Sequence, residues 1–138
     1  MMGKSKTSVL FICRNNSARS QMAEGLLNAM YGVNYEAFSA GITPTIVNSY
    51  AVEVMKEIGI DLSKHYSKSI NDFKDKKFDY VVTVCDNAKE TCPFFPGKKT
   101  LHKNFKDPTE SESSIEETLD TFRKVRNEIK KWITETFE

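Results

Sequence analysis

Short apolar runs alternate along the chain with longer segments of helical periodicity. Residues 8–12 are almost wholly apolar, which is typical of a strand buried on both faces of a parallel sheet. From Ser20 the apolar side chains recur every three or four positions as far as Gly32, a candidate helix stop. The chain is therefore expected to open with a strand, a polar loop and a helix.

The rest of the chain continues this alternation. β-branched and aromatic runs predict three more strands, at residues 35–40, 80–84 and 100–105. Helical spacing of apolar residues predicts helices at residues 49–58 and from 115 toward the C-terminus, and a short polar helix is expected near 70–74. Asn48 is a suitable N-cap for the first of these helices, and Ser114 with Glu117 forms a capping box for the last.

Strands that alternate with helices predict a single α/β domain over residues 1–138, with an open sheet and helices on both faces. In such sheets a ligand binds beyond the carboxyl ends of the strands. Cys13 and Cys85 each follow a predicted strand directly. The functional site is therefore expected at this edge of the sheet.

Composition narrows the class of protein. Among 138 residues, 20 lysines and arginines against 19 acidic residues leave a net charge of +1, which lacks the basic footprint of a nucleic-acid binder. Three cysteines, an odd number, do not suit a disulfide-stapled secreted scaffold. No run approaches the roughly 20 apolar residues of a membrane span. We expect a cytoplasmic protein without membrane or nucleic-acid partners, and a monomer.

The polar loop after the first strand carries the most distinctive chemistry. It joins Cys13 to Arg19 and Ser20 through five residues, Arg14, Asn15, Asn16, Ser17 and Ala18. The amides of such a loop form an anion-binding nest, and the helix behind it adds its positive end. Arg19 can grip a tetrahedral oxyanion with two parallel hydrogen bonds, and Ser20 can donate to the sulfur. Cys13 is then a stabilised thiolate and a candidate nucleophile beneath a bound oxyanion.

The sequence CRNNSARS at 13–20, followed by QMAEG at 21–25, resembles the low-molecular-weight protein tyrosine phosphatase superfamily. It is most similar to the thioredoxin-coupled arsenate reductases within it. The similarity continues at residues 39–41, 57–61, 82–85, 107–108 and 122–129. It covers nearly the whole chain and implies a four-stranded parallel sheet flanked by helices.

The resemblance implies a role for each of the three thiols. Cys13 would attack arsenate while Asp107 protonates the departing hydroxyl as general acid. Cys85 would form a disulfide with Cys13, and Cys92 would then take over that disulfide so that thioredoxin can reduce it. No cofactor and no metal are expected. Residues 109–111, Thr-Glu-Ser, replace the aromatic residues common near this loop in the phosphatases, which favours a small inorganic substrate.

Other interpretations of these residues stay open. A low-molecular-weight phosphatase would use Cys13, Arg19 and Asp107 and leave the other two cysteines as bystanders. Asp-Pro is also a common turn starter without chemistry. Non-enzymatic alternatives are an anion-binding or redox-sensing module and a phosphocarrier. A zinc site that combines cysteines with His65 or His102 is another alternative, although the spacing of these residues does not resemble a zinc finger.

Two positions concern charge near the loop. Some arsenate reductases carry a potassium pocket, and Asn16, Glu24 and Ser39 match three of its ligands, but Lys68 stands where an aspartate would complete it. Because a lysine ammonium can replace the cation there, no bound potassium is predicted. Arg14 either raises anion affinity or faces solvent, and solvent is the prediction.

Overall fold

The computed structural model describes residues 6–85, 95–109 and 114–137 and contains one four-stranded sheet. All strand pairs are parallel, in the order β2-β1-β3-β4. The strands are β1 (Thr7–Cys13), β2 (Tyr35–Gly41), β3 (Tyr80–Thr83) and β4 (Lys99–His102). The helices are α1 (Arg19–Tyr31), α2 (Ser49–Lys56), the 3₁₀ helix η1 (Ile70–Phe73) and α3 (Ile115–Thr136). The predicted parallel α/β sheet is confirmed.

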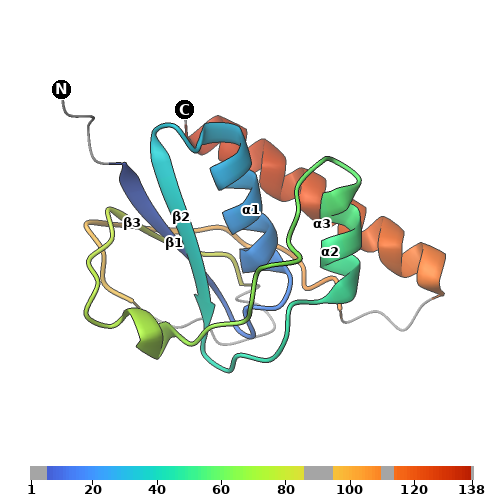
Figure 1. Ribbon diagram of the computed structural model, residues 1–138, viewed down its shortest axis with the longest axis horizontal. Helices are drawn as coiled ribbons and strands as arrows, with labels where there is room; N and C mark the ends of the chain where they lie inside the picture. The colour runs from blue at the N-terminus through green and yellow to red at the C-terminus, as the bar shows by residue number, and fades with distance from the viewer. Residues whose placement is uncertain (1–5, 86–94, 110–113, 138) are drawn as a thin grey trace.

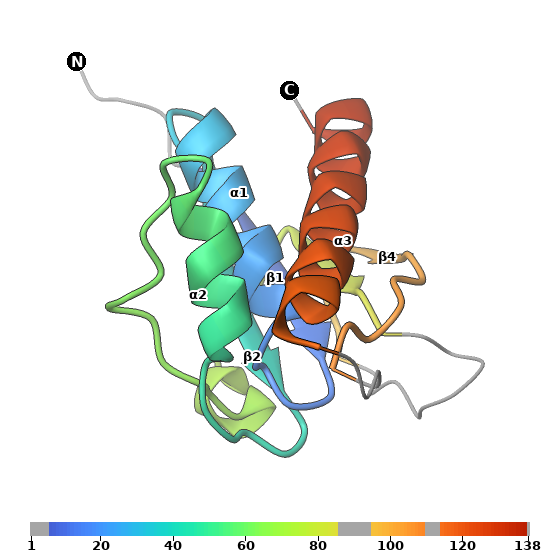
Figure 2. The ribbon, with the colours of Figure 1, turned by 90° about the vertical axis from the view of Figure 1, so that its right-hand side faces the viewer.

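β1 is a central strand of the sheet, and its side chains pack into two separate cores, one on each face. Val9, Phe11 and Cys13 face the core beneath the α-helices, whereas Leu10 and Ile12 face the other side. Both sets are buried, which explains why the run is apolar without alternation. Figures 1 and 2 show α1, α2 and α3 gathered on one face of the sheet. Within the described residues the opposite face carries only one helix, the single turn of η1.

Two element boundaries and the exposure of one residue depart from the sequence pattern. α2 ends at Lys56, and the chain reverses through Gly59, whose φ of +80° suits glycine. β4 covers 99–102 because only this stretch pairs with β3. Ile115, the first apolar position of the helix predicted from residue 115, is 66% exposed because it opens the first turn, ahead of the buried residues. No helix in the described part of the chain is long and apolar enough to cross a membrane.

Asp79 ties the starts of β1 and β3 together, at the edge opposite the carboxyl ends of the strands. Its Oδ2 accepts from the Ser8 amide at 2.9 Å, and its Oδ1 lies 3.2 Å from Lys98 Nζ. The hydrogen bond from Ser8, and next the one from Lys98, lower the pKa of Asp79 below its usual value. The carboxylate therefore stabilises the fold at neutral pH, and this stabilisation is lost as the pH falls through its native pKa.

We expect Asp79→Ala to lower the free energy of unfolding by about 1 kcal/mol at pH 7, because the Ser8 amide loses its partner. The measurement is urea unfolding at pH 7 and at pH 3, where the difference from wild type should shrink. Asp75→Ala is the control, since Asp75 is exposed and its loss changes the net charge equally. An equal loss of stability at both pH values would contradict this role.

Candidate active site

The loop between β1 and α1 holds a cysteine and an arginine that are both almost fully buried. Cys13 ends β1 and is 2% exposed, and Arg19 begins α1 and is 4% exposed. The N-cap position of α1 is Ala18, which offers no side-chain cap. The first amides of α1 are therefore not satisfied by a capping side chain, an arrangement suited to binding an anion.

A small cavity opens above this loop. Its volume is about 90 Å³, well below the several hundred cubic ångströms typical of pockets for organic ligands. The lining comes from the loop, from the segment after β2 and from the segment after β4: Cys13, Asn15, Ser17, Ala18, Arg19, Thr45, Asp107 and Thr109. Such a cavity suits a small tetrahedral oxyanion.

Asp107 faces Arg19 across this cavity. Its Oδ2 lies 3.7 Å from Arg19 Nη2, and its side chain is 23% exposed. Its Oδ1 accepts from the Thr109 amide at 2.9 Å and from the Thr109 hydroxyl at 2.6 Å. The carboxyl is thus fixed by the turn it begins, with one oxygen directed toward the arginine. An acid placed here can deliver a proton to a group leaving a bound oxyanion.

Ser20 is hydrogen-bonded to the sulfur of Cys13. The Oγ–Sγ distance is 2.9 Å, and the same Oγ accepts from Asn16 Nδ2 at 2.8 Å. Because Asn16 donates a hydrogen bond to this oxygen, the Ser20 hydroxyl can direct its own hydrogen toward the sulfur. A hydrogen bond of this kind stabilises a thiolate.

Asn16 holds the loop from beneath. Its φ of 49° is in the left-handed region, which asparagine tolerates better than most residues. Its Oδ1 accepts from Gln21 Nε2 at 2.9 Å and from the Lys68 amide at 2.8 Å. The side chain predicted to bind substrate is therefore fully buried in a supporting network.

Gly41, at the end of β2, touches the same loop. A Cβ at this position would lie 2.7 Å from Arg14 O and 2.7 Å from Asn16 N. Real Cβ atoms essentially never approach backbone this closely, so any side chain here would push the loop away. Glycine is therefore required at position 41 for β2 to approach the loop this closely.

Cys85 lies beside Cys13 because their strands are neighbours. Val84 N donates to Ile12 O at 2.9 Å, and Cys85 Sγ donates to the same oxygen at 3.8 Å. Both cysteines are buried in the same core, and neither forms a disulfide. Cys92, predicted as the third thiol of the site, lies outside the described residues.

The structure separates the predicted binding residues into three groups. Asn15, Ser17, Ala18 and Arg19 line the cavity, and Asn16 supports the loop from below. The side chain of Arg14 is exposed, as expected for the solvent-facing alternative.

Sequence reasoning missed two supporting residues. Ser67 Oγ donates to Asn15 O at 2.8 Å and accepts from the Thr45 amide at 2.9 Å, so it joins two parts of the cavity wall. Gln21 is fully buried and bonds Asn16 and the Tyr66 carbonyl. A polar residue beside Met22 on the inner side of α1 was a signal for Gln21, whereas no local pattern indicates Ser67.

Lys68 lies in the cluster that resembles a potassium pocket. Its Nζ is 3.7 Å from Glu24 Oε1 and donates to the Tyr66 carbonyl at 2.9 Å. Ser39 Oγ donates to the same Glu24 oxygen at 2.5 Å. The lysine thus places a positive charge beside this carboxylate, as its position in the sequence suggested.

The two histidines considered as zinc ligands lie apart and have other partners. His65 Nδ1 is 3.0 Å from Gln21 Oε1, and His102 Nδ1 is 2.6 Å from Thr83 Oγ1. Among the described residues, no three His, Cys, Asp or Glu side chains form a group that could hold a metal.

Together these features define a class of protein. A parallel α/β domain ends its first strand at a buried cysteine, and the next helix begins, uncapped, at a buried arginine. An aspartate faces that arginine across a cavity sized for an inorganic oxyanion. Such an arrangement is suited to nucleophilic attack by sulfur on a bound oxyanion.

The chain belongs to the low molecular weight phosphotyrosine protein phosphatase family, whose model matches residues 8–138. A relative from Halalkalibacterium halodurans named arsenate reductase is 44% identical over 129 residues, 93% of each chain. A solved structure of an arsenate reductase in the phosphate binding state has a TM-score of 0.79 and 28% identity, and covers 94% of this chain and 95% of that one. The thioredoxin-dependent arsenate reductase of Corynebacterium glutamicum has a TM-score of 0.66 and 30% identity, and covers 99% of this chain and 66% of that one. The predicted family resemblance is confirmed.

Proposed function

We propose that this chain reduces arsenate to arsenite with Cys13 as nucleophile and a disulfide relay through Cys85 and Cys92. The observation that carries the proposal is the second buried thiol, Cys85, whose sulfur lies 3.8 Å from the carbonyl oxygen of the residue that precedes Cys13. A phosphatase resolves its intermediate with water and needs no such thiol. The names of the similar proteins support the same choice of reaction.

Arsenate binds in the cavity above the loop. The amides of the loop and of the first turn of α1 supply uncharged donors, and Arg19 supplies a planar cationic one. The volume of about 90 Å³ favours an inorganic oxyanion over an aryl phosphate. Inorganic phosphate, which has the same shape and charge, is expected to bind at the same place.

Reaction begins when the Cys13 thiolate attacks arsenic. A sulfur–arsenic bond forms and an arsenic–oxygen bond breaks, and Asp107 gives its proton to the departing hydroxyl, which leaves as water. Ser20 stabilises the thiolate before attack, through the hydrogen bond at 2.9 Å. Arsenic is still in the +5 state in this adduct.

The two electrons are transferred in the next step. Cys85 thiolate attacks the sulfur of Cys13, the sulfur–arsenic bond breaks, and its electron pair stays on arsenic, which leaves as arsenite. Cys13 and Cys85 are now joined in a disulfide. Cys92 thiolate then attacks Cys85, which frees Cys13 as a thiolate and leaves a Cys85–Cys92 disulfide.

The reductant of that last disulfide is a dithiol protein of the thioredoxin class. The name of the Corynebacterium glutamicum protein supports this partner, since it specifies thioredoxin dependence. Thioredoxin would attack the Cys85–Cys92 disulfide, form a mixed disulfide and leave both cysteines reduced. Such a cycle needs a reducing compartment, which agrees with the expectation of a cytoplasmic protein.

The relay is tested by NADPH oxidation with arsenate, thioredoxin and thioredoxin reductase. We expect Cys92→Ser to stop after one stoichiometric turnover, because Cys13 stays locked in its disulfide with Cys85. Arsenite released per protein molecule, measured after quenching, should then equal about one. Unchanged steady-state turnover of Cys92→Ser would rule out the relay.

A phosphatase activity is the second candidate, because Cys13, Arg19 and Asp107 would also serve hydrolysis of a phosphoester. Hydrolysis of p-nitrophenyl phosphate by wild type and by Cys92→Ser separates the two activities. We expect slow hydrolysis that Cys92→Ser leaves unchanged. Turnover of this ester far above that of arsenate would make the phosphatase the principal function.

A further inference from the structure

Two contacts join the arginine at the end of the loop to a short segment on the far side of the cavity. Arg19 Nη1 donates to the carbonyl oxygen of Phe105 at 3.3 Å, and Arg19 Nη2 lies 3.7 Å from Asp107 Oδ2. The guanidinium is a rigid planar fork, so its two contacts fix its direction together. The position of the segment at 105–107 therefore sets where Arg19 points.

This segment is no longer part of the sheet. β4 ends at His102, and the Lys103 amide still donates to Thr83 O at 3.0 Å. Beyond that point the backbone is irregular, and the side chain of Phe105 is its anchor in the core, with 3% exposure. The ring of Phe105 meets the ring of Trp132 edge to face, with centroids 6.3 Å apart and planes at 79°.

Trp132 is itself held by the aromatic residues around the end of α3. Its ring meets Phe137 edge to face at 5.9 Å, and Phe137 meets Phe11 of β1 at 6.5 Å. Edge-to-face pairs of this kind are favourable beyond the area they bury. A continuous row of rings thus connects the centre of the sheet to Phe105 and, through its carbonyl, to Arg19.

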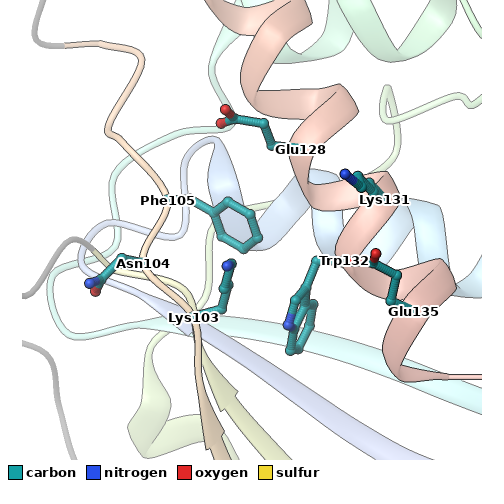
Figure 3. Close-up of a pocket in the computed structure, with 7 residues that line it drawn as sticks. All are labelled: Lys103, Asn104, Phe105, Glu128, Lys131, Trp132 and Glu135. Carbon is teal, nitrogen blue, oxygen red and sulfur yellow. The ribbon is translucent and has the colours of Figure 1, made fainter.

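A cavity of about 280 Å³ lies between this segment and α3. Figure 3 shows Phe105 and Trp132 projecting into the same space from opposite sides. The remaining lining residues are polar or charged: Lys103, Asn104, Glu128, Lys131 and Glu135. Because the space beside the ring pair is open, Phe105 can shift into it when its aromatic partner is removed.

We infer that Trp132 and Phe105 are positioning residues for oxyanion binding, acting through the Phe105 carbonyl on Arg19 and through the same segment on Asp107. The inference rests on the proposed use of the Cys13 loop as an oxyanion site. Loss of the Trp132 ring lets the segment move, and Arg19 then loses the direction needed for two parallel hydrogen bonds to the oxyanion.

The fluorescence of Trp132 can report on its connection to Arg19. Trp132 is the only tryptophan in the sequence. When an oxyanion engages Arg19, the hydrogen bond to Phe105 O and the ring contact with Trp132 adjust together. Titration of the wild-type protein with inorganic phosphate is therefore expected to change tryptophan fluorescence saturably, although Trp132 is outside the oxyanion cavity.

The main test is calorimetric titration of reduced full-length protein with inorganic phosphate, which needs no arsenate chemistry. Trp132→Leu is expected to weaken phosphate binding about tenfold, a change of about 1.4 kcal/mol. Phe105→Leu should have a similar effect, because it removes the other ring of the pair. Trp132→Phe keeps an aromatic edge and should restore binding to within about twofold of wild type.

Phe122→Leu is the matched control. Phe122 is a fully buried ring of the same helix, but its ring pairs with Tyr50 at 5.5 Å, whereas the ring of Phe105 pairs with Trp132. It should lose stability in urea and keep wild-type phosphate affinity. Equal phosphate binding by Trp132→Leu and wild type, or an equal loss in Phe122→Leu, would overturn the inference.

The outcome also separates this inference from the proposed function. If wild type binds phosphate, shows the ring dependence and fails to reduce arsenate, the positioning role stands and the reductase proposal is wrong. If wild type reduces arsenate while Trp132→Leu binds phosphate normally, only the positioning role is wrong. Absence of phosphate binding by the wild-type protein overturns the inference as well.

Discussion

Cys13→Ser is expected to abolish arsenite formation while phosphate binding survives. The hydroxyl of serine is a far weaker nucleophile than a thiolate and cannot form the disulfide that releases arsenite. Loss of the nucleophile should lower the single-turnover rate at least about 10⁴-fold. The groups that bind the oxyanion, the loop amides and Arg19, are unchanged, so phosphate affinity by calorimetry should stay within about threefold, about 0.7 kcal/mol.

Cys85→Ser provides the contrast for this variant. It keeps the nucleophile and the binding groups but lacks the thiol beside Ile12 O, so the reaction should stop at the Cys13–arsenic adduct without release of arsenite. Intact-protein mass spectrometry distinguishes the adduct in Cys85→Ser from unmodified protein in Cys13→Ser. Arsenite release by Cys13→Ser at a rate within tenfold of wild type would place the nucleophile at another residue.

The succession of elements could be predicted because the strands and helices leave different patterns. β1 contributes to two cores, so its apolar residues are contiguous, whereas α3 covers one face and keeps a spacing of three or four. Boundaries were less predictable because they depend on tertiary pairing. β4 ends at His102 and not near Phe105, since Phe105 leaves the sheet to pack its ring under α3.

The site likewise contains residues that could be predicted from the sequence and residues that could not. The cysteine, the loop and the arginine are contiguous in sequence, and the adjacency of Cys85 follows from two strands that end at the same edge. The supports of the loop come from distant positions: the Lys68 amide bonds Asn16 and the Phe105 carbonyl bonds Arg19. Main-chain partners of this kind leave no pattern of residue types, so only the structure finds them.

Arg19→Lys is expected to lower kcat/KM for arsenate about 10²–10³-fold, the loss typical when one donor to a developing oxyanion is removed. An ammonium keeps the charge but cannot make two parallel hydrogen bonds to the oxyanion. It also cannot contact Phe105 O and Asp107 in the fork geometry seen for Arg19. The measurement is steady-state reduction with excess thioredoxin, together with phosphate affinity, which should fall by a smaller factor.

Arg126→Lys is a control of the same kind at a different place. Arg126 is also buried, at 8% exposure, and it bonds a main-chain carbonyl, Val54 O at 2.7 Å, and a carboxylate, Glu57 at 3.0 Å. Because these contacts join α2 to α3 away from the loop, Arg126→Lys should reduce stability and leave kcat/KM within about twofold. Comparable losses of kcat/KM in both variants would show that Arg19 acts through the stability of the fold and not through the oxyanion.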